Sequence, residues 1–132
     1  MPDPKPENVL RTDADGRTVQ DVGGLDFGPI DRDEHDLALW EKRTDAMLGL
    51  LVSPKKAAFK LDGLRRTIES YRQQDYDRID YYDKWIKAIR NLMVEQKVLT
   101  AKEIDQRMAE LAKKHASAGR KIEPARLTED LE

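Results

Sequence analysis

Side chains that commonly hold metals or perform covalent chemistry are scarce in this sequence. It contains no cysteine, which excludes disulfides, zinc-thiolate sites and thiol nucleophiles. The two histidines, His35 and His115, lie far apart in the chain, and neither belongs to a His-x-x-x-His or Glu-x-x-His spacing. The residue types therefore predict that this chain alone holds no metal ion.

One arginine is placed among apolar residues. Arg65 lies between Leu64 and Ile68, so on a helix it would border the buried face. The residues alone favour an ordinary surface ion pair with Glu69, one helical turn later, over a functional role for this arginine. Such a pair contributes only about 0.3–0.5 kcal/mol.

The composition narrows the classes of function. The chain has 132 residues, enough for one domain with a modest core, and 38% of them are charged. Its 24 Lys and Arg against 26 Asp and Glu give a formal charge of -2, which indicates neither a nucleic-acid surface nor a polybasic membrane anchor. The first residues lack the apolar core of a signal peptide, and no apolar run reaches membrane-spanning length. A cytoplasmic location is expected.

Residues 1–32 are predicted to form an extended arm, because they mix Pro, Gly and Asp without helical or strand periodicity. The Gly23-Gly24 and Gly28-Pro29 steps prevent a regular element that could bury the apolar residues of the arm internally. We therefore expect the arm to lie on another chain, with a disordered terminus as the alternative, chiefly for residues 1–19. The apolar residues are Val22, Leu25, Phe27 and Ile30.

Residues 33–116 are predicted to form about four short amphipathic helices, which would position the residues named above. The first is expected from about Asp33 to Val52, because apolar residues recur there at steps of three, four or seven. Asp31 or Asp33 could cap it. Ser53-Pro54 would end it, since proline removes a backbone donor and disfavours helical geometry before it.

Three further helices follow in the prediction. A short one is indicated over residues 61–71, with nothing in residues 73–75 to extend it, and a central core helix over about 80–96. The stretch Thr100-Ala101-Lys102-Glu103 is a capping box that begins the last helix, and residues 117–132 form a tail. The fold class is therefore all-α, an arm followed by about four helices, with no β-barrel.

The segment from Lys60 to Ile104 resembles the N-terminal helical half of the nitrile hydratase β subunit. Arg65 is followed by Glu69, Tyr76, the tandem Tyr81-Tyr82 and Trp85 in the order and spacing typical of that family. The stretch NLMVEQKVLTAKEI is similar to the family's L-x-V-E-K-G-x-L-T-x-x-E, with Gln96-Lys97 where Lys-Gly is usual. The stretch QDVGGLDFGPI resembles the family's glycine-containing arm, and the resemblance covers residues 20 to about 112.

The resemblance implies one subunit of a heteromeric lyase that adds water to a nitrile to give an amide. In the family, a partner α subunit holds the metal with a cluster of cysteines, some of them oxidised. Cobalt(III) is expected there rather than iron(III), because Trp85 is more typical of cobalt-type members. The resemblance therefore implies a chain that binds no cofactor of its own and is inactive alone. No strand-like segment follows the last helix, so the β-barrel of the β subunit is expected on a separate chain, as in thiocyanate hydrolase and toyocamycin nitrile hydratase.

The resemblance also assigns the site residues. Arg65 matches the arginine that bonds to the oxidised cysteine oxygens, a task for which a planar guanidinium is better suited than an ammonium group. Four residues match positions that line the substrate cavity, although core packing is an equal and compatible role for the two leucines. They are Tyr81, Trp85, Leu61 and Leu64.

Three alternatives stay open at this point. A thiocyanate hydrolase β-type subunit would share the fold and the partner. An accessory protein that loads metal into the catalytic subunit is a second alternative, and the glycine-containing arm QDVGGLDFGPI counts against it. A small helical adaptor without a link to catalysis would need only the capped amphipathic helices.

Overall fold

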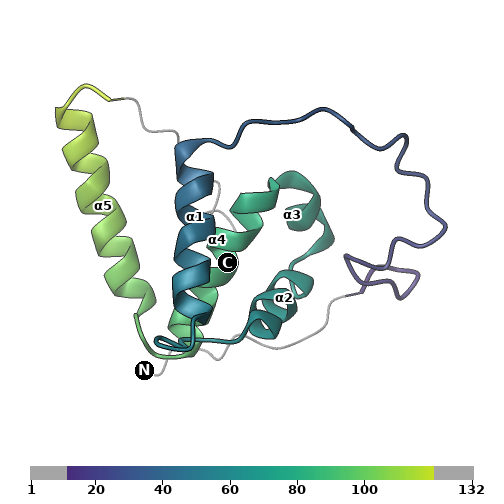
Figure 1. Cartoon of the computed structure of the whole chain (residues 1–132), viewed down its shortest axis with the longest axis horizontal. Helices are drawn as coiled ribbons and strands as arrows, with labels where there is room; N and C mark the ends of the chain where they lie inside the picture. Colours follow the sequence, from purple (N-terminus) through teal and green to yellow (C-terminus); the bar gives the residue numbers. More distant parts are fainter. Residues whose placement is uncertain (1–11, 121–132) are drawn as a thin grey trace.

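A computed structural model describes residues 12–120, and over this range the chain is helical, with no strand (Figure 1). The predicted all-α class is confirmed. The parts of the expected arm and tail that fall on residues 1–11 and 121–132 lie outside the described residues. The helices are α1 (Leu39–Val52), α2 (Leu61–Glu69), α3 (Gln73–Arg78), α4 (Tyr81–Glu95) and α5 (Ala101–Ser117).

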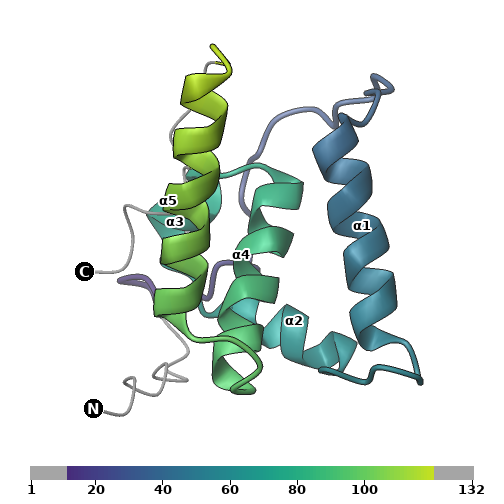
Figure 2. The same cartoon turned by 90° about the vertical axis from the view of Figure 1, so that its left-hand side faces the viewer.

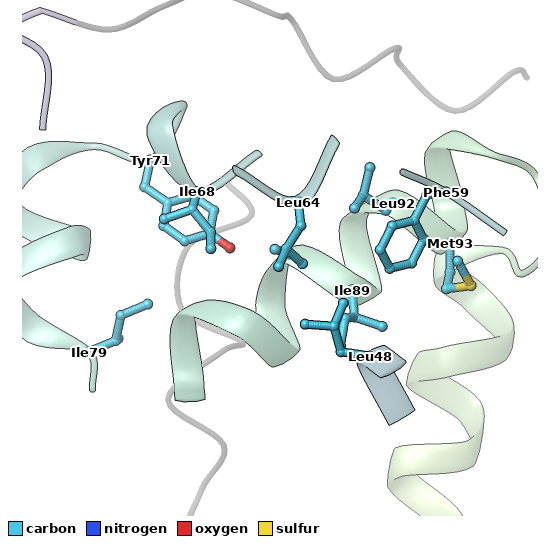
Figure 3. Packing of buried hydrophobic residues seen from close by; sticks show 10 residues of the cluster. Leu48, Phe59, Leu64, Ile68, Tyr71, Ile79, Ile89, Leu92 and Met93 are labelled. Atoms are coloured by element: carbon cyan, nitrogen blue, oxygen red, sulfur yellow. The ribbon is translucent and has the colours of Figure 1, made fainter. Parts of the chain in front are cut away.

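The core is built around α4, which confirms the predicted central helix. Helices α1 and α2 both pack against it, and α4 itself buries Ala88, Ile89, Leu92 and Met93. Figure 3 shows the buried side chains turned toward one another, with Phe59, Leu92 and Met93 grouped at one end of the cluster. Each fully buried side chain of this kind stabilises the fold by about 1.5–3 kcal/mol. The other members of the cluster are Leu48, Leu64, Ile68, Tyr71 and Ile79.

The predicted start of the first helix was wrong by about six residues, because α1 begins at Leu39. Asp31 accepts hydrogen bonds from the backbone of Asp33 at 2.9 Å and from His35 at 3.1 Å, and both bonds lower its pKa. These local side-chain bonds compete with helix formation, and residues 31–38 have no regular secondary structure. The end of the helix is as predicted, since Val52 is followed by the extended Ser53 before Pro54.

Helix α3 was missed in the prediction, which left residues 73–75 without an element. It has only six residues and no apolar periodicity that a pattern could detect. Gln73 donates from its amide to both carboxylate oxygens of Asp77 at 2.9 and 3.0 Å, and the flanking Tyr71 and Ile79 are buried in the core. So short a helix depends on these anchors rather than on its own propensity.

Helix α5 begins where the capping box predicted. The Thr100 hydroxyl accepts from the Glu103 backbone at 3.2 Å, and the Glu103 carboxylate accepts from the Thr100 backbone at 2.8 Å. The helix runs along the outside of the bundle in Figures 1 and 2 and buries none of its residues fully. Arg90 of α4 links to it through Asp105 at 3.7 Å.

The described part of the arm swings away from the bundle, past α2 and α3, before it returns to α1 (Figure 1). Every residue from 20 to 38 is exposed, including the four apolar residues expected to need burial. Phe27 is 71% exposed and Ile30 is 85% exposed. Within the described range, no helix has the length and apolar character needed to cross a membrane.

Candidate functional site

Arg65 points outward from a helix that is itself packed on the core. Its side chain is 66% exposed, and its Nη1 lies 3.5 Å from Oδ1 of Asp62. This distance is at the limit of a hydrogen bond, and Asp62 is still more exposed, so the contact is weak. The surface pair considered from the sequence was with Glu69, whereas the structure gives Asp62 as the partner.

The neighbouring Arg66 forms a strong ion pair with another helix, unlike Arg65. Its Nη2 donates to both carboxylate oxygens of Glu95, at 2.9 and 3.0 Å, and thereby joins α2 to the end of α4. Consecutive residues of a helix leave it about 100° apart, so the two arginines face different directions. Arg66 is paired with another helix of the bundle, and Arg65 stays directed to the outside. Sequence periodicity could not reveal this ion pair, whose partners are 29 residues apart.

The two leucines matched to the substrate cavity lie in different environments. Leu64 is 2% exposed and belongs to the core cluster. Leu61 is 43% exposed and lies one helical turn before Arg65, on the same side of α2. Leu61 and Arg65 therefore share an exposed surface, whereas Leu64 packs beneath it. A cavity-lining role for either leucine stays a prediction.

Tyr81 and Trp85 lie together at the start of α4, with ring centroids 5.1 Å apart. Tyr82, which the sequence-based site did not include, completes a group of three rings, at 5.3 Å from each of the others. Its pKa is raised, first by partial removal from water and then by the negative charge of Asp45, by Tyr81 and by Glu41. The two acidic residues among these, Asp45 and Glu41, belong to α1, so Tyr82 faces that helix. Tyr81 is largely exposed.

The predicted site residues form two groups at different levels of α4. The start of α2 lies beside the C-terminal half of α4, because a Cβ on Gly63 would contact Leu92 at 3.6 Å and Arg66 reaches Glu95. Trp85 lies seven residues before Leu92, which is about 10 Å along the helix. Arg65 and Leu61 are therefore separated along α4 from the aromatic group of Tyr81, Tyr82 and Trp85.

A third set of contacts fixes α3 against α4. The Tyr71 hydroxyl donates to the backbone oxygen of Lys84 at 2.8 Å, and burial raises the pKa of that hydroxyl, which therefore stays protonated. Lys84 Nζ lies 3.7 Å from the centroid of the Tyr76 ring, and partial burial lowers its pKa. These contacts hold α3 and the residues before it against α4, next to the candidate site residues at the start of α4.

The described residues contain no group of three His, Asp or Glu side chains placed to hold a metal ion. The full sequence also contains no cysteine. Cobalt(III) or iron(III) held by a cysteine cluster does not fit the side chains of this chain. Its residues can instead offer a guanidinium to an anionic group, together with apolar and aromatic surface.

Comparisons with known proteins agree with the resemblance drawn from the motifs. The sequence profile of a family described as the nitrile hydratase beta subunit, N-terminal, matches residues 17–130. A nitrile hydratase subunit beta from Pseudomonas putida is 34% identical over 90 residues. The match covers 65% of this chain and 41% of that relative, so the chain spans less than half of the length of the relative.

Proposed function

The chain belongs to the nitrile hydratase β-subunit N-terminal family, and from this premise we propose that it is a β-type subunit of a heteromeric nitrile hydratase. In this proposal, the assembled enzyme adds water to a small nitrile and yields the amide. The metal, cobalt(III) rather than iron(III), is held by a cysteine-cluster α subunit. This chain completes the site in the cytoplasm and is inactive alone.

The position of Arg65 is the observation that carries the proposal. An exposed guanidinium with one weak partner, on a helix held firmly by the core, is available to an acceptor outside the chain. Oxidised cysteine oxygens are anionic and accept charge-assisted hydrogen bonds, which strengthen when the partner excludes water. Docking would exchange the weak contact with Asp62 for such bonds, and a planar guanidinium can form two of them in parallel.

The remaining site residues would shape the substrate pocket. Leu61 lies beside Arg65 and supplies apolar surface, and Leu64 supports that turn of α2 from the core. Tyr81 and Trp85 supply an aromatic wall at the other level of α4. A small nitrile is well suited to such a pocket, because apolar walls exclude water and leave orientation to a few polar groups.

The arm and the outer side of α1 would form the assembly surface. Phe27 and Ile30 of the arm are exposed, and so are Leu39 and Leu50 of α1. Exposed large apolar groups of this kind are what a partner surface can cover. We propose that the α subunit covers them.

The test is replacement of Arg65 by lysine in the assembled enzyme, with propionitrile as substrate. We expect at least about a hundredfold lower kcat with the chain retained in the complex, because lysine lacks the paired donors that stabilise the site. Arg107→Lys is the matched control, since Arg107 is equally exposed and pairs with Glu110 three residues away. Near-normal activity of Arg65→Lys would remove Arg65 from the site.

The same preparations separate the alternatives. Turnover of thiocyanate in preference to propionitrile would assign the thiocyanate hydrolase type. Loss of the chain from the complex once the metal is loaded would assign an accessory role. Retention of the chain in stoichiometric amount in the active complex supports the proposed subunit.

A further inference from the structure

The link between Arg66 and Glu95 ties α2 to α4 at the residue next to Arg65. One guanidinium nitrogen, Nη2, bonds to both carboxylate oxygens, and the side chain of Arg66 is 43% exposed and that of Glu95 27% exposed. The Arg65 contact with Asp62 is longer and more exposed, and both of its partners belong to α2. The Arg66–Glu95 pair can therefore fix α2 relative to α4, which the Arg65–Asp62 contact cannot do.

Helix α2 needs such a link because it is short. Its nine residues are too few to be stable in isolation, so its position is set by its contacts. Leu64 and Ile68 attach one side of it to the core. Apolar contacts of this kind hold the helix on the core but have little directional preference, so they do not by themselves set its rotation about its own axis. Arg66, about 100° from Arg65 around that axis, is placed to oppose such a turn.

We propose that Glu95, through Arg66, is a positioning residue that sets the direction in which Arg65 leaves the bundle. The inference rests on the function proposed above for Arg65. A guanidinium that forms paired hydrogen bonds depends on its direction, and a displacement of about 1 Å can reduce the rate about a hundredfold.

The pair is absent from the site assigned by the resemblance, which includes Arg65 and neither Arg66 nor Glu95. Glu95 belongs to the stretch NLMVEQKVLTAKEI, where its role could be read as an exposed residue near the end of a helix. In the structure it is instead a long-range partner for α2. Because Glu95 would act through Arg66 and not touch the substrate, its role in catalysis is measured through the activity of the assembled complex.

The experiment replaces Glu95 by glutamine, which keeps the shape of the side chain and removes its charge, and measures kcat and KM per assembled complex with propionitrile. We expect kcat to fall about tenfold with KM changed less than about threefold, because Arg65 is misdirected while the pocket stays in place. The matched control is Glu110→Gln, which breaks the exposed Arg107–Glu110 pair on α5. It should leave kcat within about twofold.

A charge swap distinguishes positioning from simple loss of stability. Arg66→Glu combined with Glu95→Arg restores an ion pair, and it should recover at least half of the lost kcat. A residue that only stabilised the fold would reduce the amount of complex without changing kcat per complex. If Glu95→Gln does not assemble, Arg66→Gln removes the charge from the other partner and gives the same comparison.

The outcomes separate this inference from the proposed function. If Arg65→Lys is inactive and Glu95→Gln has normal kcat, the positioning role is wrong and the proposed function stands. If Arg65→Lys is fully active, Arg65 has no role in the site and the positioning role is wrong as well, whatever the activity of Glu95→Gln, while turnover of propionitrile still supports the nitrile hydratase assignment. Loss of activity in Arg65→Lys, with a reduced kcat in Glu95→Gln and recovery in the charge swap, supports both.

Discussion

The packed bundle and the exposed arm follow different rules, although both are rich in apolar residues. In the bundle, Leu48 of α1 and Leu92 of α4 are buried in one continuous cluster. In the arm, Phe27 and Ile30 are open to solvent, and Leu50 of α1, only two residues after Leu48, is 67% exposed. The bundle buries its apolar residues within this chain, whereas the arm and the outer side of α1 leave theirs exposed, on the surface that we propose the partner subunit covers.

The arginines of α2 show the same division at the scale of one turn. Arg66, itself 43% exposed, is paired with Glu95 of α4, and Arg65 extends outward with a weak contact to Asp62 of its own helix. A side chain used for stability finds its partner within the chain. One used in assembly or catalysis is left with its strongest donors available.

The largest effect is expected from truncation in the bundle. Leu92→Ala should reduce the free energy of unfolding of the chain by about 2–5 kcal/mol, because it removes packed atoms and leaves a cavity. Leu50→Ala, the control on the exposed side of α1, should change it by less than about 0.5 kcal/mol. Urea unfolding followed by circular dichroism measures both. Equal effects would mean that Leu50 on the outer side of α1 is packed as closely as Leu92 in the core.

In the arm, truncation of an apolar side chain should weaken binding to the partner and leave the stability of the free chain unchanged. Phe27→Ala is expected to weaken association with the partner subunit about tenfold, the effect of losing one aromatic contact in an interface. The unfolding free energy of the free chain should not change, since Phe27 is exposed there. Isothermal titration with the purified partner measures the affinity. Unchanged affinity would show that this residue stays uncovered in the complex.

The cap of α5 tests an element that lies outside the core. Thr100→Ala removes the hydroxyl that accepts from Glu103 and should destabilise the start of α5 by about 1 kcal/mol. Amide hydrogen exchange should become faster in the first turns of α5 and stay unchanged in α4. Faster exchange throughout α4 would show instead that α5 supports the core.

The smallest effect concerns the aromatic group. Asp45→Asn should lower the pKa of Tyr82 toward its usual value, because one of the causes of the raised pKa is the charge of Asp45. A raised pKa means that the folded chain keeps the proton longer than the unfolded chain. Stability from this group is therefore present below the usual pKa of tyrosine and is lost as pH rises above it. Ultraviolet titration of the tyrosinate signal measures the shift, and Asp77→Asn is the control.

Much of the bundle could be predicted because its signals are local. The periodicity of residues 80–96 and the capping box at Thr100 depend on neighbours within one or two turns, and both predictions were confirmed. The start of α1 was wrong because Asp31 forms a turn with Asp33 where a helix cap was expected. Helix α3 was missed because contacts outside it, rather than its own pattern, hold it in place.

The candidate site was predictable only in part, for a related reason. The contact between Tyr81 and Trp85 follows from their spacing of four residues. The third ring, Tyr82, and the Arg66–Glu95 pair depend on how α1, α2 and α4 meet, which periodicity does not encode. Whether Arg65 acts on a partner depends on a chain outside this one, so the resemblance alone suggested it.

The most direct test is an experimental structure of the chain assembled with its cysteine-carrying partner. We predict that the Arg65 guanidinium lies within about 3 Å of sulfur-bound oxygens of the partner, at hydrogen-bond distance. The arm should cross the surface of the same subunit, with Phe27 and Ile30 covered. A structure that leaves Arg65 in open solvent, far from the metal centre, would contradict the account.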